Sequence, residues 1–148
     1  MSVTFYSDSP ETTRSWAIQL AARLQAPVVV ALYGDLGAGK TLVAQAIAAA
    51  LGVTGPVTSP TFTLINEYDL SDGGILFHVD CYRLQNPEAE AVALGLTELF
   101  DQGVVLIEWA DRIASLLPDD RIDVVLQDAG PGHRRIEMTD RRFVMRET

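Results

Sequence analysis

Several features that define large classes of protein are absent from this sequence. Cys81 is the only cysteine, so no internal disulfide can form and no second thiol is available for a metal cluster; we assign it no role. No apolar stretch reaches the roughly 18 residues of a membrane helix, and the first residues lack the pattern of a secretory signal. We therefore expect a cytoplasmic protein.

Repeats, low-complexity tracts and linkers long enough to separate domains are also missing. A chain of 148 residues that is 48% hydrophobic has room for one substantial core. We expect residues 1–148 to form one domain.

Positive charge is scarce as well. The formal net charge of −9 disfavours a general nucleic-acid coat, because phosphate backbones are held mainly by lysine and arginine. Contact with RNA would have to be local or through a partner. Residues 134–148 form a basic segment, either a solvated strand face with a frayed end or a docking surface, which contains Arg134, Arg135, Arg141, Arg142 and Arg146.

The sequence does contain alternating strand and helix patterns. Residues 28–32 and 104–107 are continuous apolar runs, typical of strands covered on both faces. Ser9 and Pro10 offer a cap and a first-turn proline to a helix that ends near Pro27. Other expected strands are 3–6, 62–69, 75–80, 121–127 and 134–139, and other expected helices are 42–51, 87–100 in two pieces, and a short one ending at Leu117.

The motif GDLGAGKT at residues 34–41 matches G-x-x-x-x-G-K-[ST] at every fixed position. Its glycines allow backbone N–H groups to face phosphate oxygens, and the following helix presents its positive end to the same anion. Lys40, the only lysine in the chain, would reach the β- and γ-phosphates, and the Thr41 hydroxyl would take one magnesium position. The predicted nucleotide contacts here are Gly34, Asp35, Leu36, Gly37, Ala38, Gly39, Lys40, Thr41 and Leu42.

Together these patterns predict an α/β fold. We expect a three-layer P-loop NTPase sheet with a mostly parallel core and antiparallel strands at its edges. The expected ligands are ATP and Mg²⁺.

Phosphoryl transfer also requires an acid to steady magnesium and a group that orients the attacking water. Glu108 and Asp80 each end a strand pattern, where open α/β sheets face their ligands. With Lys40, they are the expected catalytic residues, and Thr41 and Glu108 are the expected metal ligands. His78 lies on the same face as Asp80, but a lone histidine there more often packs in the core.

Residues 58–62, TSPTF, follow the glycine motif at a separation typical of nucleotide-sensing segments. A hydroxyl there could sense the γ-phosphate or magnesium. The alternative is an ordinary turn before a strand.

The combination GDLGAGKT, TSPTF, FHVDCYRL, LGLTELF and VVLIEWADR closely resembles the bacterial TsaE (YjeE) family. This resemblance implies an ATPase that supports threonylcarbamoylation of adenosine 37 in ANN-decoding tRNAs. The implied partners are the proteins TsaB and TsaD, which carry out the transfer itself, so that contact with tRNA is indirect.

Carried over by position, the resemblance implies further nucleotide contacts. Thr61 matches a switch-like threonine, and Trp109 matches a tryptophan beside the magnesium carboxylate, with core packing as its alternative. Thr13 and Arg134 match the base and sugar end.

Two other functions remain open from the sequence. A small metabolite kinase would share the glycine motif but would need an arginine-rich lid, which we do not find. A nucleotide-gated binding module would dock without turnover. Guanine specificity is disfavoured, because an N-K-x-D element cannot exist in a chain whose only lysine is Lys40.

Overall fold

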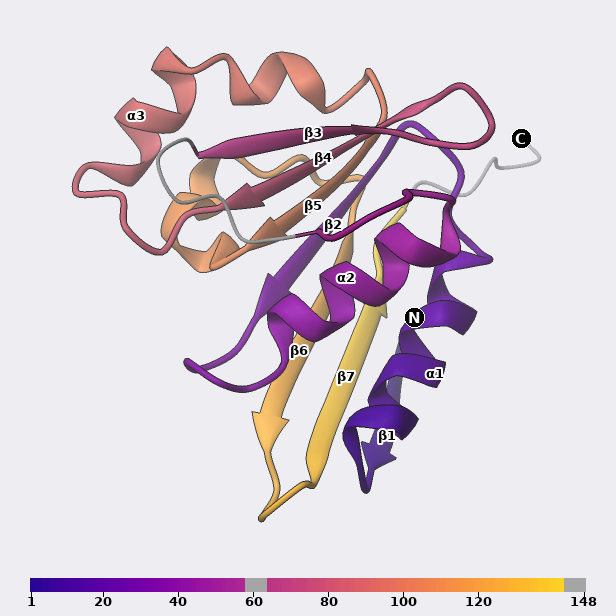
Figure 1. Ribbon diagram of the computed structural model, residues 1–148. Helices are drawn as coiled ribbons and strands as arrows, with labels where there is room; N and C mark the ends of the chain where they lie inside the picture. Colours follow the sequence, from indigo (N-terminus) through magenta and orange to yellow (C-terminus); the bar gives the residue numbers. More distant parts are fainter. Residues whose placement is uncertain (58–63, 143–148) are drawn as a thin grey trace, which may run out of the picture.

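The computed structural model describes residues 1–57 and 64–142. A seven-stranded sheet forms its centre, with helices on both faces (Figure 1). The strands are β1 (Ser2–Ser7), β2 (Val28–Tyr33), β3 (Ile65–Asp69), β4 (Ile75–Asp80), β5 (Val104–Glu108), β6 (Ile122–Asp128) and β7 (Arg134–Asp140). The helices are α1 (Pro10–Ala21), α2 (Lys40–Ala50), α3 (Pro87–Ala93) and two 3₁₀ helices, η1 (Leu96–Leu99) and η2 (Ala110–Leu116).

The strand order across the sheet is β1-β7-β6-β2-β5-β4-β3. Strands β6, β2, β5 and β4 pair in parallel. At one side β7 pairs antiparallel with both β6 and β1, and at the other side β3 pairs antiparallel with β4. The expected parallel core with antiparallel edges is therefore confirmed. All four parallel strands therefore end at the same edge of the sheet.

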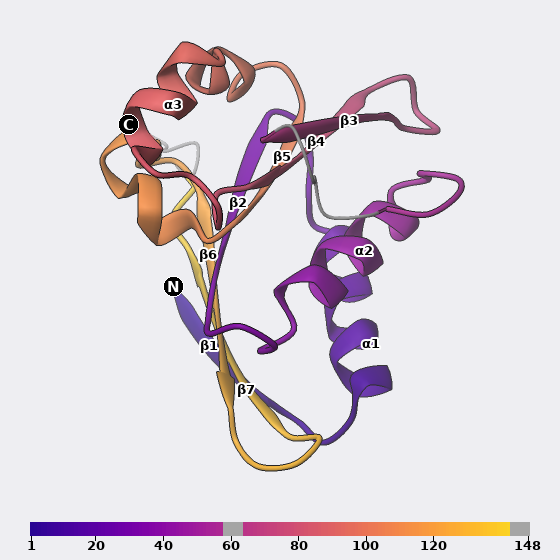
Figure 2. The ribbon, with the colours of Figure 1, turned by 60° about the vertical axis from the view of Figure 1, so that its left-hand side comes forward.

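Two apolar clusters hold the layers together. Because successive side chains of a strand point to opposite faces, β2 feeds both clusters. Val30 and Leu32 pack with α1 and α2, while Val29 and Ala31 pack with α3, η1 and η2. Figure 2 shows α1 and α2 on one side of the sheet and α3 on the other. The three layers agree with the continuous apolar run that predicted a strand covered on both faces.

Local sequence explains how α1 begins. The Ser9 side chain accepts a hydrogen bond from the Thr12 N–H at 3.1 Å, and Pro10 occupies the first turn, where its missing N–H costs nothing. The sequence predicted both features. The short helix that the sequence predicted before Leu117 is η2, a 3₁₀ helix that Ile113 interrupts at φ −127°. None of the helices in the described part of the chain is both long and apolar enough to cross a membrane.

Pairing with acids accounts for the basic segment as far as the structure describes it. Each of its four described arginines lies within 4 Å of a carboxylate, in the pairs Arg134–Asp128 at 3.5 Å, Arg135–Glu137 at 3.7 Å, Arg141–Asp123 at 3.5 Å and Arg142–Asp140 at 2.7 Å. These pairs favour the solvated strand face over a docking surface. Arg146 lies outside the described residues.

Candidate functional site

A glycine loop, residues 34–39, connects β2 to α2. Gly34, Gly37 and Gly39 have φ values of +151°, +81° and +109°, which side-chain-bearing residues rarely adopt. At Gly34 space is also limiting, because a Cβ would lie 2.5 Å from the Leu126 carbonyl oxygen on β6. The loop therefore depends on glycine for its path, and it ends where α2 begins at Lys40.

Lys40 is buried at the base of this loop, with 4% of its surface exposed. Its ammonium donates hydrogen bonds to the Gly34 carbonyl at 2.5 Å and the Asp35 carbonyl at 2.8 Å. It also lies 4.0 Å from the centre of the Trp109 ring, within range of a cation–π contact. Burial lowers the pKa of Lys40, and the negative charge of Glu108 offsets part of that shift.

Glu108, at the end of β5, meets two side chains from neighbouring elements. The Thr41 hydroxyl donates to its Oε1 at 2.8 Å, and His78 Nε2 lies 2.5 Å from its Oε2. Glu108 is 2% exposed and His78 is fully buried. The structure thus brings together Lys40, Thr41 and Glu108, three of the residues expected from the sequence.

Asp80 lies beside Glu108, because β4 and β5 pair these two residues in register. Asp80 is half-buried, and its Oδ1 accepts a hydrogen bond from the Tyr82 N–H at 2.9 Å. Burial raises the pKa of the Asp80 carboxyl, the Tyr82 hydrogen bond opposes this shift, and repulsion from Glu108 adds to it. A carboxyl held in this way has an increased affinity for a proton.

These groups surround a cavity of about 280 Å³. Its wall combines one end of the glycine loop, the start of α2 and the ends of β4 and β5; the lining residues are Leu36, Gly37, Gly39, Lys40, Thr41, Leu42, Asp80, Tyr82, Glu108 and Trp109. The lining thus combines glycine backbone, one ammonium and two carboxylates. That combination suits a polyanion accompanied by a cation.

The sequence did not single out Tyr82. Its ring lies 4.8 Å from that of Trp109, at an interplanar angle of 34°, and together they form an aromatic wall of the cavity. Trp109 has φ +59°, the only positive φ among the described residues other than glycine. Its position two residues after Asp80 is the one feature of the sequence that could have indicated Tyr82 as a residue of this cavity.

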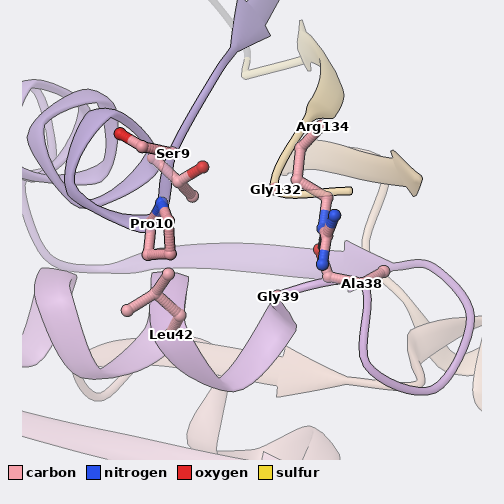
Figure 3. Close-up of a pocket in the computed structure, with 8 residues that line it drawn as sticks. Ser9, Pro10, Ala38, Gly39, Leu42, Gly132 and Arg134 are labelled. Carbon is pink, nitrogen blue, oxygen red and sulfur yellow. Dashed lines mark hydrogen bonds between the residues drawn. The ribbon is translucent and has the colours of Figure 1, made fainter. Parts of the chain in front are cut away.

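A second, smaller cavity of about 60 Å³ lies behind the glycine loop, at the start of α1. Thr13 and Arg134 both line it, together with Pro10 and Leu42. Figure 3 shows Arg134 extending toward Ala38, opposite Pro10 and Leu42. The structure thus brings the two residues expected at the base and sugar end to one place.

Arg134 is nonetheless bound to the protein itself. Its Nε donates to the Ala38 carbonyl at 2.9 Å and its Nη2 to the Gly37 carbonyl at 3.1 Å. The Thr13 hydroxyl is 2.7 Å from that of Ser7 and is buried. Arg134 therefore ties β7 to the glycine loop, a role that the sequence did not predict.

Thr61, the expected switch-like residue, lies outside the described residues. In the described ranges, 1–57 and 64–142, no group of three or more His, Cys, Asp or Glu side chains could hold a metal.

Comparison with known proteins identifies the family. The model of the family described as threonylcarbamoyl adenosine biosynthesis protein TsaE matches residues 7–136. The tRNA threonylcarbamoyladenosine biosynthesis protein TsaE of Bacillus subtilis (strain 168) is 44% identical over 133 residues, covering 88% of this chain and 81% of the relative. The protein of the same name from Nostoc sp. is 40% identical over 144 residues, covering 94% of this chain and 86% of the relative.

Structural similarity agrees with these matches. The crystal structure of Bacillus subtilis YdiB matches with a TM-score of 0.77 and 38% sequence identity, covering 95% of this chain and 86% of that chain. The similarity thus extends over the sheet, the glycine loop and the strand ends that form the cavity. The chain belongs to the TsaE family, as the resemblance of its motifs predicted.

Proposed function

We propose that this protein is a P-loop ATPase that binds ATP with Mg²⁺ and hydrolyses it in support of tRNA threonylcarbamoyladenosine biosynthesis. The observation that carries this proposal is the convergence of Lys40, Thr41 and Glu108 on one cavity at the start of α2. Family membership supplies the biosynthetic context.

The glycine loop and Lys40 would hold the phosphates. Backbone N–H groups at the start of α2 and the helix dipole favour an anion at this end of the cavity. The carbonyls of Gly34 and Asp35 take two of the three N–H donors of the ammonium, so the third can be directed to a phosphate oxygen. Lys40 would neutralise charge that develops on the γ-phosphate during hydrolysis.

The oxygen atoms beside Lys40 fit a magnesium ion. Thr41 Oγ1 and Glu108 Oε1 are 2.8 Å apart, close to the roughly 3 Å that separates adjacent ligands of an octahedral ion with bonds of about 2.1 Å. Magnesium in nucleotide sites takes one or two carboxylates plus phosphate oxygens, which suits a cavity without a larger cluster of ligands among the described residues. A bound magnesium would neutralise phosphate charge as the terminal phosphate leaves.

Asp80 would orient the attacking water. It borders the same cavity, and its raised pKa increases its ability to accept a proton from that water. Because Asp80 and Glu108 belong to neighbouring strands in register, one can act on water while the other steadies the metal.

The second cavity would take the adenosine end of ATP. Arg134 already donates to the carbonyls of Ala38, Gly37 and His133, so its guanidinium would meet a base through its flat face, and Pro10 and Leu42 would pack against the opposite side. The Thr13 hydroxyl, which is paired with Ser7, could only accept a hydrogen bond from the base. Adenine is favoured over guanine because the chain has no second lysine for an N-K-x-D element.

The resemblance to TsaE proteins supports TsaB and TsaD as partners, with tRNA contacted through them. Under this proposal the present chain supplies ATP hydrolysis and the partners transfer the threonylcarbamoyl group. Tyr82 and Leu36 leave 42% and 74% of their surfaces exposed at the main cavity, where a partner could complete the site.

Replacing Lys40 by alanine tests the proposal. The variant should lose hydrolysis, because no other lysine can neutralise the γ-phosphate. Arg14→Ala removes the same charge from an exposed position on α1 and should keep activity. Release of phosphate from ATP, with and without TsaB and TsaD, is the measurement.

The outcomes separate the three candidate functions. Wild-type turnover by Lys40→Ala would refute the site assignment. Phosphorylated acceptor in place of inorganic phosphate would indicate a kinase. Partner-dependent tRNA modification that survives Asp80→Asn, with nucleotide still bound but not hydrolysed, would indicate a nucleotide-gated binding module.

A further inference from the structure

His78 is a polar exception within an apolar strand. On β4 it follows Leu76 and Phe77 and precedes Val79, and all four side chains are buried. Apolar residues of similar volume can fill such a position without leaving a polar atom unpaired. The presence of an imidazole there therefore calls for an explanation.

The only hydrogen-bond partner of the His78 side chain within the described residues is Glu108. His78 Nε2 lies 2.5 Å from Glu108 Oε2, whereas Nδ1 has no partner in the described part of the chain. Buried polar atoms are usually paired, and an unpaired one costs stability. The unpaired Nδ1 of His78 therefore costs stability, and the only contact that can offset this cost is the one between Nε2 and the Glu108 carboxylate of the candidate site.

The two oxygens of Glu108 are held by two different elements. Thr41, at the start of α2, binds Oε1, and His78, on the adjacent strand β4, binds Oε2. If Oε1 leaves Thr41 to meet a cation, the contact at Oε2 still fixes the plane of the carboxylate. Groups that orient a metal-binding carboxylate in this way tune both affinity and geometry.

We propose that His78 is a positioning residue that holds the Glu108 carboxylate with Oε1 directed toward Thr41 and the magnesium position. This inference rests on the proposed function. With Nε2 protonated, His78 would donate to Oε2 of the Glu108 carboxylate, and because His78 is not among the residues that line the cavity it would act only through Glu108.

Two amide substitutions at this position form a matched pair. In His78→Gln the side-chain amide nitrogen can occupy the place of Nε2 and donate to Glu108. In His78→Asn the amide is one methylene shorter and falls near the place of Nδ1, so it cannot reach. Both variants bury a polar amide of the same kind, and their thermal unfolding temperatures report any shared effect on folding.

The first measurement is calorimetric titration of each protein with ATP, with and without Mg²⁺. The magnesium-dependent gain in ATP affinity should fall about tenfold or more in His78→Asn, the range for losing a group that orients a metal ligand. His78→Gln should keep most of this gain. Metal-free ATP affinity should be the same in both variants, because the loop amides and Lys40 are unchanged.

A double-mutant comparison isolates the route through Glu108. In a Glu108→Gln background, His78→Asn should cause no further loss of the magnesium-dependent gain, because the group it positions is already gone. Equal losses in the wild-type and Glu108→Gln backgrounds would mean that His78 acts by general packing, and would overturn the inference.

The remaining outcomes separate this inference from the proposed function. A wild-type protein that shows no gain in ATP affinity with Mg²⁺ would refute both. A wild-type gain that His78→Asn retains in full would refute the role of His78 alone, as would equal losses in His78→Asn and His78→Gln.

Discussion

Arg134 links strand β7 to the glycine loop, and replacing it by alanine removes two hydrogen bonds to that loop at once. The lost bonds are those from Nε to the Ala38 carbonyl and from Nη2 to the Gly37 carbonyl. A trans peptide points its carbonyl and its N–H in opposite directions. Holding these two carbonyls on the β7 side therefore turns the next N–H groups, those of Ala38 and Gly39, away from it. The Ala38 N–H also bonds to the Asp35 carbonyl at 3.0 Å, so alanine at position 134 chiefly frees the peptide that carries the Gly39 N–H to reorient.

The expected magnitude follows from the exposure of the side chain. Hydrogen bonds from a charged donor contribute roughly 1.5–3 kcal/mol when buried. Because 25% of the Arg134 side chain is exposed, we take about 1 kcal/mol for each bond, or about 2 kcal/mol together. If the nucleotide-bound state loses the whole of these 2 kcal/mol, nucleotide affinity falls by up to about 30-fold.

Calorimetric titration of Arg134→Ala with ATP and with inorganic triphosphate is the assay. A role in ordering the loop predicts the same proportional loss for both ligands, whereas a base contact through the guanidinium face adds a loss for ATP only. Arg134→Lys keeps the charge but lacks the planar set of N–H donors of a guanidinium, so its ligand affinity should lie between those of the wild type and Arg134→Ala. Arg135→Ala removes the neighbouring charge, which bonds to Gln127 and not to the loop, and serves as the control.

Unchanged affinity for triphosphate in Arg134→Ala would refute the idea that this residue orders the phosphate-binding amides. An equal loss in Arg135→Ala would also refute it, because general electrostatic attraction would then explain the effect.

Two further predictions concern stability. Gly34→Ala should destabilise the fold by more than about 2 kcal/mol, because its Cβ would lie 2.5 Å from a backbone oxygen. Gly37→Ala, which has open space around it and φ +81°, should cost only about 1–2 kcal/mol. Denaturant unfolding measures both free energies, and equal losses would contradict this steric explanation. Burial and the hydrogen bond to Asp123 raise the pKa of Tyr33 to about 12 from 10.0, so the folded state favours the neutral phenol. The stabilisation from the neutral Tyr33 phenol is therefore complete below pH 10 and is lost as the pH rises from 10 to 12. Tyr33→Phe should remove this part of the pH dependence, and an unchanged unfolding profile in that interval would show that the phenol does not contribute.

Local patterns were sufficient to predict much of the fold. The apolar runs identified β2 and β5 as covered strands, and Ser9 with Pro10 identified the start of α1. The expectation that Glu108 and Asp80 share an edge also needed only the rule that parallel strands align their carboxyl ends. These features depend on residues close together in sequence or on a general property of sheets.

Contacts between distant residues could not be predicted in the same way. The hydrogen bond between His78 and Glu108 depends on β4 lying beside β5, and many strand orders are compatible with the same strands. The attachment of Arg134 to the glycine loop likewise requires β7 to fold back beside β6. The expectation that Arg134 contacts a nucleotide therefore came only from family resemblance, and its contact with the loop backbone had no local signal.

The same attachment spans 96 and 97 positions of the chain, from Arg134 back to Ala38 and Gly37. During synthesis the loop leaves the ribosome long before Arg134, which bonds to it. A nascent chain would therefore carry an incomplete candidate site until β7 emerges and pairs with β6. Ligand capture would then follow closure of the sheet and not precede it.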